Sequence, residues 1–310
     1  MTTTPVGRFA PSPSGRLHLG NVLCALLSWL SARRGGGKIL LRIEDIDTVR
    51  CTAQNTAALL DDLRWLGLSF DGGEEPHAYQ SHRTAIYADY FERLRRQNRL
   101  YPCYCTRAEL HAASAPHRSD RQPVYDRRCL RYLHGEQPPP DRTPAWRLQV
   151  PDTAVSFTDR LQGPFSENLS RDCGDFLVRR SDGVYAYQLA VVVDDALSGV
   201  TEVVRGRDLL SSTPRQIYLY HLFGFPPPQF YHIPLLLRQD GARLAKRDGA
   251  LDMGALRERF SSPEPLIGML AYNAGLLPRY EPISAAALIP SFSWDKVPRR
   301  DIFLDACSLL

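Results

Sequence analysis

The chain has 310 residues, of which 44% are hydrophobic and 23% charged, so it is long enough to bury a sizeable core and to divide into two or three lobes. Its start, "MTTTPVGRFA", lacks the apolar segment of a secretory signal peptide, and its longest apolar stretches are too short to span a bilayer. Seven unevenly spaced cysteines argue against a disulfide framework. These features argue against a secreted or membrane-spanning protein and predict a cytoplasmic one.

Arginine supplies nearly all of the positive charge. The formal net charge is +4, and only three of the 38 basic residues are lysines: Lys38, Lys246 and Lys296. Genomic base composition alone can produce such a bias. Because arginine also suits phosphate contacts, the balance leans weakly toward a nucleic-acid partner.

The first fifty residues predict a βαβ unit. "VGRFA" (6–10) is typical of a short strand, "GNVLCALLSWLSARR" (20–34) has apolar residues at helical spacing, and glycines 35–37 end that helix. "KILLRIEDID" (38–47) begins like a strand buried on both faces. This order implies a parallel sheet, and the loop "PSPSGRLHLG" (11–20) then lies at the carboxyl end of the first strand, where open α/β sheets bind ligands.

That loop has the properties of a phosphate-binding turn. Its prolines stiffen it, its glycines permit close backbone approach, and a helix that begins near Leu19 offers free N–H groups and a partial positive charge. His18 stands where its ring could donate to the same phosphate. The alternative interpretation is a rigid turn that contains an incidental histidine.

The middle of the chain predicts two amphipathic helices followed by an insertion. The helices lie within 52–68, with Thr52 as the cap, and within 83–100. Residues 101–144 are rich in Pro, Arg, Tyr and Cys and have poor periodicity, which indicates an inserted lobe with its own stabilisation.

Within the insertion, Cys103 and Cys105 are followed by Tyr125 and Cys129. Three thiolates and one oxygen could complete a tetrahedral zinc site. The spacing alone is also compatible with free buried cysteines, because C-x-C is tighter than the usual ligand pair.

Further strands are expected after the insertion. "AWRLQV" (145–150) and "GVYAYQLAVVVDDAL" (183–197) have strand character, and 190–210 predicts another pair of sheet strands, with an Asp pair and a Gly-rich turn between them. "IPLLLRQDGARLAKRDGA" (233–250) ends the sheet region with a basic loop, and the final sixty residues read as small helices.

Four segments, taken together and in register, closely resemble the catalytic core of class I glutamyl-tRNA synthetases over nearly the first 250 residues: "RFAPSPSGRLHLGN", "RIEDID", "VVVDDALSGVTEVVRGRDLLSSTPRQ" and "RLAKRDGA". "HLGN" (18–21) corresponds to the family's His-Ile-Gly-His motif, and "RLAKR" (243–247) to its Lys-Met-Ser-Lys-Ser loop. Two positions depart from the family pattern. Asn21 replaces the second histidine, and Ala245 replaces the serine.

The resemblance implies an α/β protein with a Rossmann-like parallel-sheet nucleotide-binding domain. Its first half would be 1–100, followed by an inserted zinc-binding lobe at 101–184. The second half, with the basic loop, would be 185–250, and a short helical region would occupy 251–310.

The length of the C-terminal part limits the resemblance to one group of related enzymes. Only 63 residues follow Arg247, whereas a full glutamyl-tRNA synthetase adds large helical domains that read the anticodon. This pattern is similar to the glutamyl-queuosine tRNA(Asp) synthetases, which attach glutamate to queuosine in the anticodon of tRNA(Asp). The expected partners are therefore ATP, L-glutamate and queuosine-containing tRNA(Asp), bound by a monomer that does not contact a membrane.

The resemblance also assigns roles around ATP. The reaction joins glutamate to the α-phosphorus of ATP and then transfers it to the RNA, and it requires no protein nucleophile. His18 and Lys246 would be catalytic. The ATP-binding residues would be His18, Gly20, Asn21, Arg243 and Lys246, with Mg²⁺ accompanying the nucleotide.

Glutamate needs cations for two carboxylates and an anion for its ammonium. Arg8 and Arg205 can each form a bidentate pair with a carboxylate, and Glu44 suits the α-ammonium. Tyr187 would donate to the side-chain carboxylate. By resemblance, Ala10 and Ser12 line the same pocket. The alternatives are that Glu44 pairs structurally with Arg42 or Arg50, and that Tyr187 is an ordinary core aromatic.

For the cysteine cluster, the resemblance implies a structural zinc held by Cys103, Cys105, Tyr125 and Cys129. Two other functions stay open at this point. One is a minimal glutamyl-tRNA synthetase that charges the 3′ end of tRNA(Glu), and the other is a non-catalytic tRNA-binding paralogue.

Overall fold

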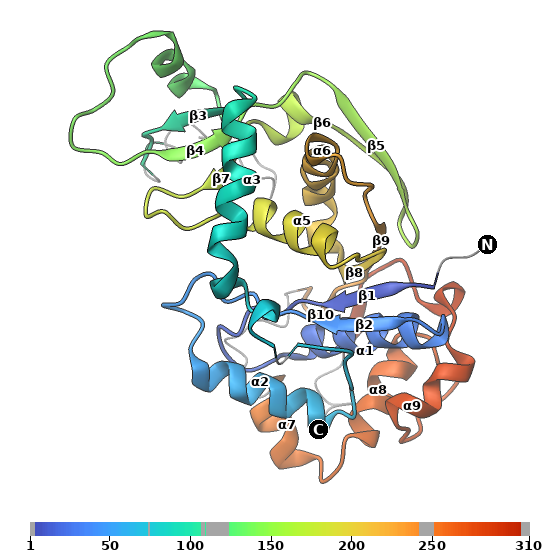
Figure 1. Ribbon diagram of the computed structural model, residues 1–310. Helices are drawn as coiled ribbons and strands as arrows, with labels where there is room; N and C mark the ends of the chain where they lie inside the picture. Colours follow the sequence, from blue (N-terminus) through green and yellow to red (C-terminus); the bar gives the residue numbers. More distant parts are fainter. Residues whose placement is uncertain (1–3, 74, 107–108, 110–123, 242–250, 305–310) are drawn as a thin grey trace.

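A computed structural model describes residues 4–73, 75–106, 109, 124–241 and 251–304. Figure 1 shows the chain as two halves, with strands β1, β2, β8 and β9 near their junction. Within the described part of the chain, no helix combines the length and the apolar character needed to cross a membrane.

The predicted βαβ unit is confirmed. Strand β1 (Val6–Phe9) is followed by helix α1 (Leu19–Arg34) and by β2 (Lys38–Leu41), which pairs with β1 in parallel. Glycine is required where the two strands start, because a Cβ on Gly37 would lie 2.1 Å from the carbonyl oxygen of Pro5. The loop between β1 and α1 therefore lies at the carboxyl end of the sheet.

Two further parallel strands extend this arrangement. They are β8 (Glu202–Gly206) and β9 (Gln229–Ile233). The amide of Thr201 donates to the carbonyl of Val6 at 2.9 Å, and a guanidinium N–H of Arg8 donates to the carbonyl of Val204 at 3.0 Å. The earlier residue of one strand contacts the earlier residue of the other, and the later contacts the later, so β1 and β8 run in the same direction. The carboxyl ends of β1, β2, β8 and β9 therefore meet at one edge.

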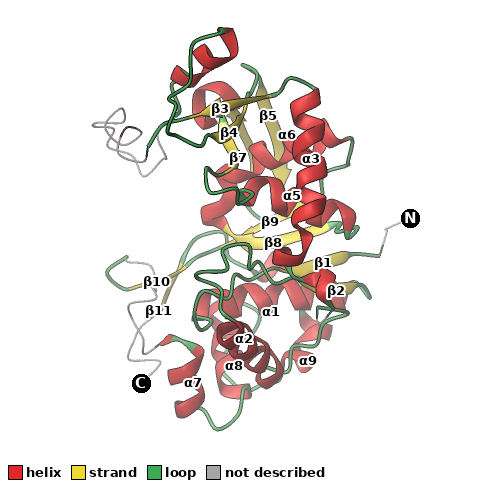
Figure 2. Cartoon of the chain, turned by 60° about the vertical axis from the view of Figure 1, so that its left-hand side comes forward, coloured by secondary structure: helices red, strands yellow, loops and turns green. Residues whose placement is uncertain are grey.

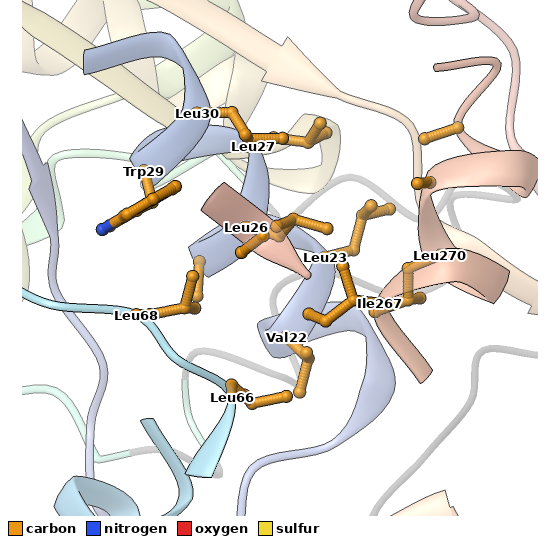
Figure 3. Packing of buried hydrophobic residues seen from close by; sticks show 14 of the residues in the cluster. Val22, Leu23, Leu26, Leu27, Trp29, Leu30, Leu66, Leu68, Ile267 and Leu270 are labelled. Carbon is orange, nitrogen blue, oxygen red and sulfur yellow. The ribbon is translucent and has the colours of Figure 1, made fainter. Parts of the chain in front are cut away.

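Helix α1 forms the centre of the first core. Its leucines are buried on every side, and Figure 3 shows Leu23 close to Ile267 and Leu270. Both of these residues belong to α8 (Glu264–Asn273). The other helices of this half are α2 (Ala53–Trp65), α7 (Met253–Arg259) and α9 (Ala285–Leu288), and the predicted cap of α2 is confirmed, since the Thr52 hydroxyl accepts from the amide of Asn55 at 3.2 Å.

The second core lies in the other half, shown from another side in Figure 2. Helix α3 (Thr84–Arg96) leads into an antiparallel sheet, and the strand predicted at 145–150 is present there over 145–148. The remaining elements of this half are β3 (Leu100–Cys103), β4 (Ala145–Leu148), β5 (Ala154–Asp159), β6 (Gly163–Asn168), β7 (Phe176–Arg179), α5 (Tyr187–Leu197) and α6 (Thr213–Phe223).

The strand predicted within 183–197 is wrong, because Tyr187–Leu197 forms helix α5. Its residues 189–195 are all buried, so the sequence shows no helical alternation of apolar and polar positions. A fully buried helix and a buried strand then have the same apolar signature. Of the predicted pair of strands in 190–210, only the second exists, as β8.

The helical C-terminal region is confirmed for α7, α8 and α9. It also contains an unpredicted strand, β11 (Ile302–Leu304), which pairs in parallel with β10 (Leu236–Arg238). The basic loop at 242–250 lies outside the described residues. The predicted division into domains stays a prediction.

Candidate active site

A cavity of about 640 Å³ opens where β1 and β8 end, beside the first turn of α1. The predicted βαβ unit placed a ligand site at this edge of the sheet. Nine of the predicted site residues line it: Arg8, Ala10, Ser12, His18, Gly20, Asn21, Glu44, Tyr187 and Arg205. Arg243 and Lys246 lie outside the described residues. The roles assigned to all of these residues stay predictions.

The start of α1 faces this cavity. His18 immediately precedes the helix, and its backbone N–H donates to the Asn21 side-chain oxygen at 3.5 Å. A Cβ on Gly20 would lie 3.2 Å from the His18 ring, so glycine leaves that ring room. The helix N-terminus adds the partial positive charge that favours an anion.

Three arginines and three carboxylates form a buried ion network beside the cavity, with side chains at most 10% exposed: Arg8, Arg42, Arg83, Glu44, Asp194 and Asp195. Asp195 accepts from Arg42 at 2.5 Å and lies 3.5 Å from the Nε of Arg8. Arg42 also donates to Glu44 at 3.1 Å. Arg8 and Glu44, which reach the cavity, are therefore held by partners that do not line it.

The pKa values of two carboxyl groups in the network are shifted in opposite directions. Burial raises the pKa of Glu44, although Arg42 and Arg8 oppose the rise. Burial also raises the pKa of Asp195, but the guanidinium groups of Arg42 and Arg8 outweigh it and hold that pKa below its usual value. The Glu44–Arg42 pair that the sequence left as an alternative is present, and Glu44 lines the cavity as well.

Tyr187 and Arg205 also line the cavity. Tyr187 begins α5 and is 37% exposed, so it is not an enclosed core aromatic. Arg205 on β8 is 4% exposed, and its guanidinium is bound by His232 and Thr213. Sequence reasoning missed His232 and placed the Asp194–Asp195 pair between two strands, whereas both residues lie in α5. Only the unusual placement of two acidic residues directly after Val191–Val193 could have marked the pair.

The predicted zinc ligands come together in the inserted lobe. The sulfur atoms of Cys103, Cys105 and Cys129 all lie within 4.8 Å of one another. The Tyr125 hydroxyl is 3.6 Å from the sulfur of Cys103 and 3.5 Å from that of Cys105, and the sulfurs of Cys105 and Cys129 are 3.5 Å apart.

These distances fit a tetrahedral zinc. With Zn–S near 2.3 Å and Zn–O near 2.0 Å, a tetrahedron places neighbouring sulfurs about 3.8 Å apart and the oxygen about 3.5 Å from each sulfur. Arg147 supports the cluster from outside, because it donates to Cys103 at 3.3 Å and stacks 3.7 Å above the Tyr125 ring. Burial raises the pKa of Cys103, but the hydrogen bond and the charge of Arg147, together with hydrogen bonds from the Cys105 backbone and Tyr125, outweigh it and lower that pKa overall.

Comparison with known proteins identifies the family. A family model described as "tRNA synthetases class I (E and Q), catalytic domain" matches residues 6–276. The "Glutamyl-Q tRNA(Asp) synthetase" of Symbiobacterium thermophilum is 50% identical over 97% of this chain and 96% of its own length. The protein of the same name from Nitratidesulfovibrio vulgaris is 44% identical over 97% and 95%. The chain belongs to the glutamyl-Q tRNA(Asp) synthetase family.

Solved structures confirm the fold of this family member. A glutamate-tRNA synthetase from Elizabethkingia anophelis superimposes with a TM-score of 0.80 at 27% identity, over 98% of this chain and 68% of that one. A glutamate tRNA ligase from Elizabethkingia meningosepticum, in complex with its amino acid, gives 0.79 at 28% identity, over 97% and 67%. The protein is thus a ligase with the α/β catalytic fold of class I aminoacyl-tRNA synthetases.

Proposed function

We propose that the protein activates L-glutamate with ATP and transfers the glutamate to queuosine in the anticodon of tRNA(Asp). The observation that carries the proposal is the cavity in which two buried arginines, a glutamate whose side chain is 9% exposed and the start of α1 meet. The names of relatives that are 44–50% identical over 97% of the chain support the choice of RNA.

The charges around the cavity suit the three ionised groups of glutamate. Arg8 and Arg205 would each bind one carboxylate, and the ionised Glu44 would bind the α-ammonium. Tyr187 would donate its hydroxyl to the side-chain carboxylate, while Ala10 and Ser12 would contribute backbone and hydroxyl groups.

Activation joins a glutamate carboxylate oxygen to the α-phosphorus of ATP and releases pyrophosphate. His18, Gly20 and Asn21 at the start of α1 would hold the phosphates, and Arg243 and Lys246 would add positive charge as the bond to pyrophosphate breaks. Mg²⁺ bound to ATP would neutralise part of the triphosphate charge. The protein acts by orienting reactants and stabilising charge, which explains why the site needs no nucleophilic side chain.

In the second step, a hydroxyl on the cyclopentene ring of queuosine attacks the activated carbonyl and displaces AMP. The protein would align the two reactants, because the adenylate is already a reactive mixed anhydride. The protein would act in the cytoplasm as a monomer.

Cys103, Cys105, Tyr125 and Cys129 would hold a structural zinc. Bound zinc supplies cross-links between the end of β3 and the short helix at Arg128–His134, and so stabilises the inserted lobe. The fit of the four donor atoms to a tetrahedron supports this assignment.

Transfer of labelled glutamate to three RNAs tests the proposal: queuosine-containing tRNA(Asp), queuosine-free tRNA(Asp) and tRNA(Glu). We expect label only on the first, located in the anticodon. Equal labelling of both tRNA(Asp) forms would refute the substrate assignment. Label at the 3′ end of tRNA(Glu) would instead establish the minimal glutamyl-tRNA synthetase that the similarity to solved glutamate-tRNA synthetases also favours. Absence of glutamate-dependent pyrophosphate–ATP exchange would indicate a non-catalytic paralogue.

A further inference from the structure

A buried chain of hydrogen bonds connects the β5–β6 hairpin to Arg205. Asp159, the last residue of β5, contacts the Nδ1 atom of His232 at 2.6 Å. The other ring nitrogen of His232, Nε2, accepts from the Nε–H of Arg205 at 3.0 Å. The side chains of His232 and Asp159 are both fully buried, so water does not compete for these contacts.

The direction of the hydrogen bonds fixes the tautomer of His232. A guanidinium has only donors, so Nε2 must carry a lone pair where it meets Arg205. The ring proton is then on Nδ1, which donates to Asp159. The carboxylate of Asp159 is itself held by the backbone amides of Leu161 and Gln162, at 3.0 and 2.7 Å. The arrangement orients a neutral imidazole with its acceptor toward the arginine.

The sheet register explains why these residues meet. Arg205 on β8 and His232 on β9 are partners in the parallel pairing, so their side chains leave the sheet on the same face. Thr213, at the start of α6, accepts from the Nη2 of Arg205 at 2.8 Å. Two of the three guanidinium nitrogens are thereby occupied by protein groups, and Arg205 also lines the cavity.

The partners of Arg205 are neutral. Among the described residues, no carboxylate forms an ion pair with it, in contrast to Arg8, which lies 3.5 Å from Asp195. A carboxylate in place of His232 would orient the arginine equally well but would cancel its charge. A neutral acceptor orients the guanidinium and leaves its charge available to an anionic ligand.

We propose that His232, fixed by Asp159, is a positioning residue that orients Arg205 toward the side-chain or α-carboxylate of glutamate and thereby sets the affinity for this substrate. The inference rests on the proposed function, because it takes glutamate as the ligand of the cavity. His232 does not itself line the cavity, whereas Arg205 does, so we assign its effect on the substrate to its hydrogen bond with Arg205.

Two substitutions at His232 separate the roles of its ring nitrogens. The amide of His232→Gln reaches the position of Nε2 and can still accept from Arg205, whereas that of His232→Asn reaches only the position of Nδ1. In glutamate-dependent pyrophosphate–ATP exchange, we expect His232→Asn to raise the KM for glutamate about 10- to 100-fold. His232→Gln should stay within about threefold of the wild type, and the KM for ATP should not change in either variant.

Asp159→Asn provides a second variant that preserves shape. Its amide oxygen would remain with the backbone amides, so its NH₂ group would face Nδ1 and force the ring proton onto Nε2, opposite the N–H of Arg205. We expect the KM for glutamate to rise as in His232→Asn. Trp29→Phe is the control, because it removes a 2.8 Å hydrogen bond of a buried side chain outside the cavity. It should lower the unfolding temperature and leave both KM values unchanged.

The outcomes are distinct. Equal effects of His232→Gln and His232→Asn, or a normal KM for glutamate in Asp159→Asn, would overturn the inference. So would parallel rises of the KM for glutamate and for ATP, which indicate general distortion of the cavity. A wild-type protein that shows no glutamate-dependent exchange would instead refute the proposed function, and the inference with it.

Discussion

Asp195 should be important for stability, because the buried ion network needs its negative charge. Its carboxylate lies between the guanidinium groups of Arg42 and Arg8, and its side chain is 4% exposed. In Asp195→Asn the shape is kept while one negative charge is lost, so the balance of three positive and three negative charges becomes a net +1 among side chains that are at most 10% exposed. Breaking a buried pair in this way costs about 3–5 kcal/mol of unfolding free energy.

Urea-induced unfolding measures this cost. Glu92→Gln is the matched control, because it breaks an ion pair with Arg95 that is also short, at 2.7 Å, but whose side chains are 42% and 58% exposed. We expect that control to lose at most about 0.5 kcal/mol. If Asp195→Asn lost no more than Glu92→Gln, the reasoning about the network would be refuted.

The pH dependence provides a second readout of the same perturbation. Arg42 and Arg8 lower the pKa of Asp195 below the value of 3.8 for an unperturbed aspartate. The stability that Asp195 contributes is therefore fully present above about pH 5 and is lost as the pH falls through the folded-state pKa. The difference in unfolding free energy between wild type and Asp195→Asn should be constant from about pH 6 to 8 and shrink below about pH 4.

Three further results are expected. The KM for glutamate should rise as the pH falls, because burial raises the pKa of Glu44 and only its ionised form attracts the ammonium; a KM that stays constant down to pH 4.5, the usual pKa of the group, would contradict this. Lys246→Ala should lower kcat for exchange about 100-fold with little change in the KM for glutamate. An unchanged kcat together with a KM for glutamate that rises by a similar factor would argue against its role at the phosphates. Protein purified without chelator should contain one zinc per chain, as measured by elemental analysis, and Cys129→Ser should contain less. Wild-type protein free of zinc would refute the assignment.

The spacing of apolar residues predicted the elements in which that spacing is typical of a helix or a strand. The unit β1–α1–β2 was predictable because its helix has apolar spacing that ends at Gly35–Gly37 and its second strand is short and apolar. Helix α5 was not, since burial of residues 189–195 on all sides removes the alternation that separates helix from strand. Its apolar side chains instead pack in the second core, and its two aspartates pair with Arg42.

The residues of the candidate site also fall into those that the sequence could predict and those that it could not. Residues in motifs, such as His18, Glu44 and Arg205, could be named from the sequence and all line one cavity. Asp159 and His232 could not, because they are 73 residues apart and meet only through the parallel register of β8 and β9 and the position of the hairpin. Single buried polar residues of this kind have no local signature until the strand pairing is known.

A crystal structure of the protein with bound L-glutamate would show whether fixed charges place this small dicarboxylic amino acid. We expect one carboxylate of the ligand on Arg8, the other on Arg205, and its ammonium within hydrogen-bond distance of Glu44. Glutamate bound elsewhere, or bound in this cavity with those three side chains turned away from it, would contradict the proposed placement.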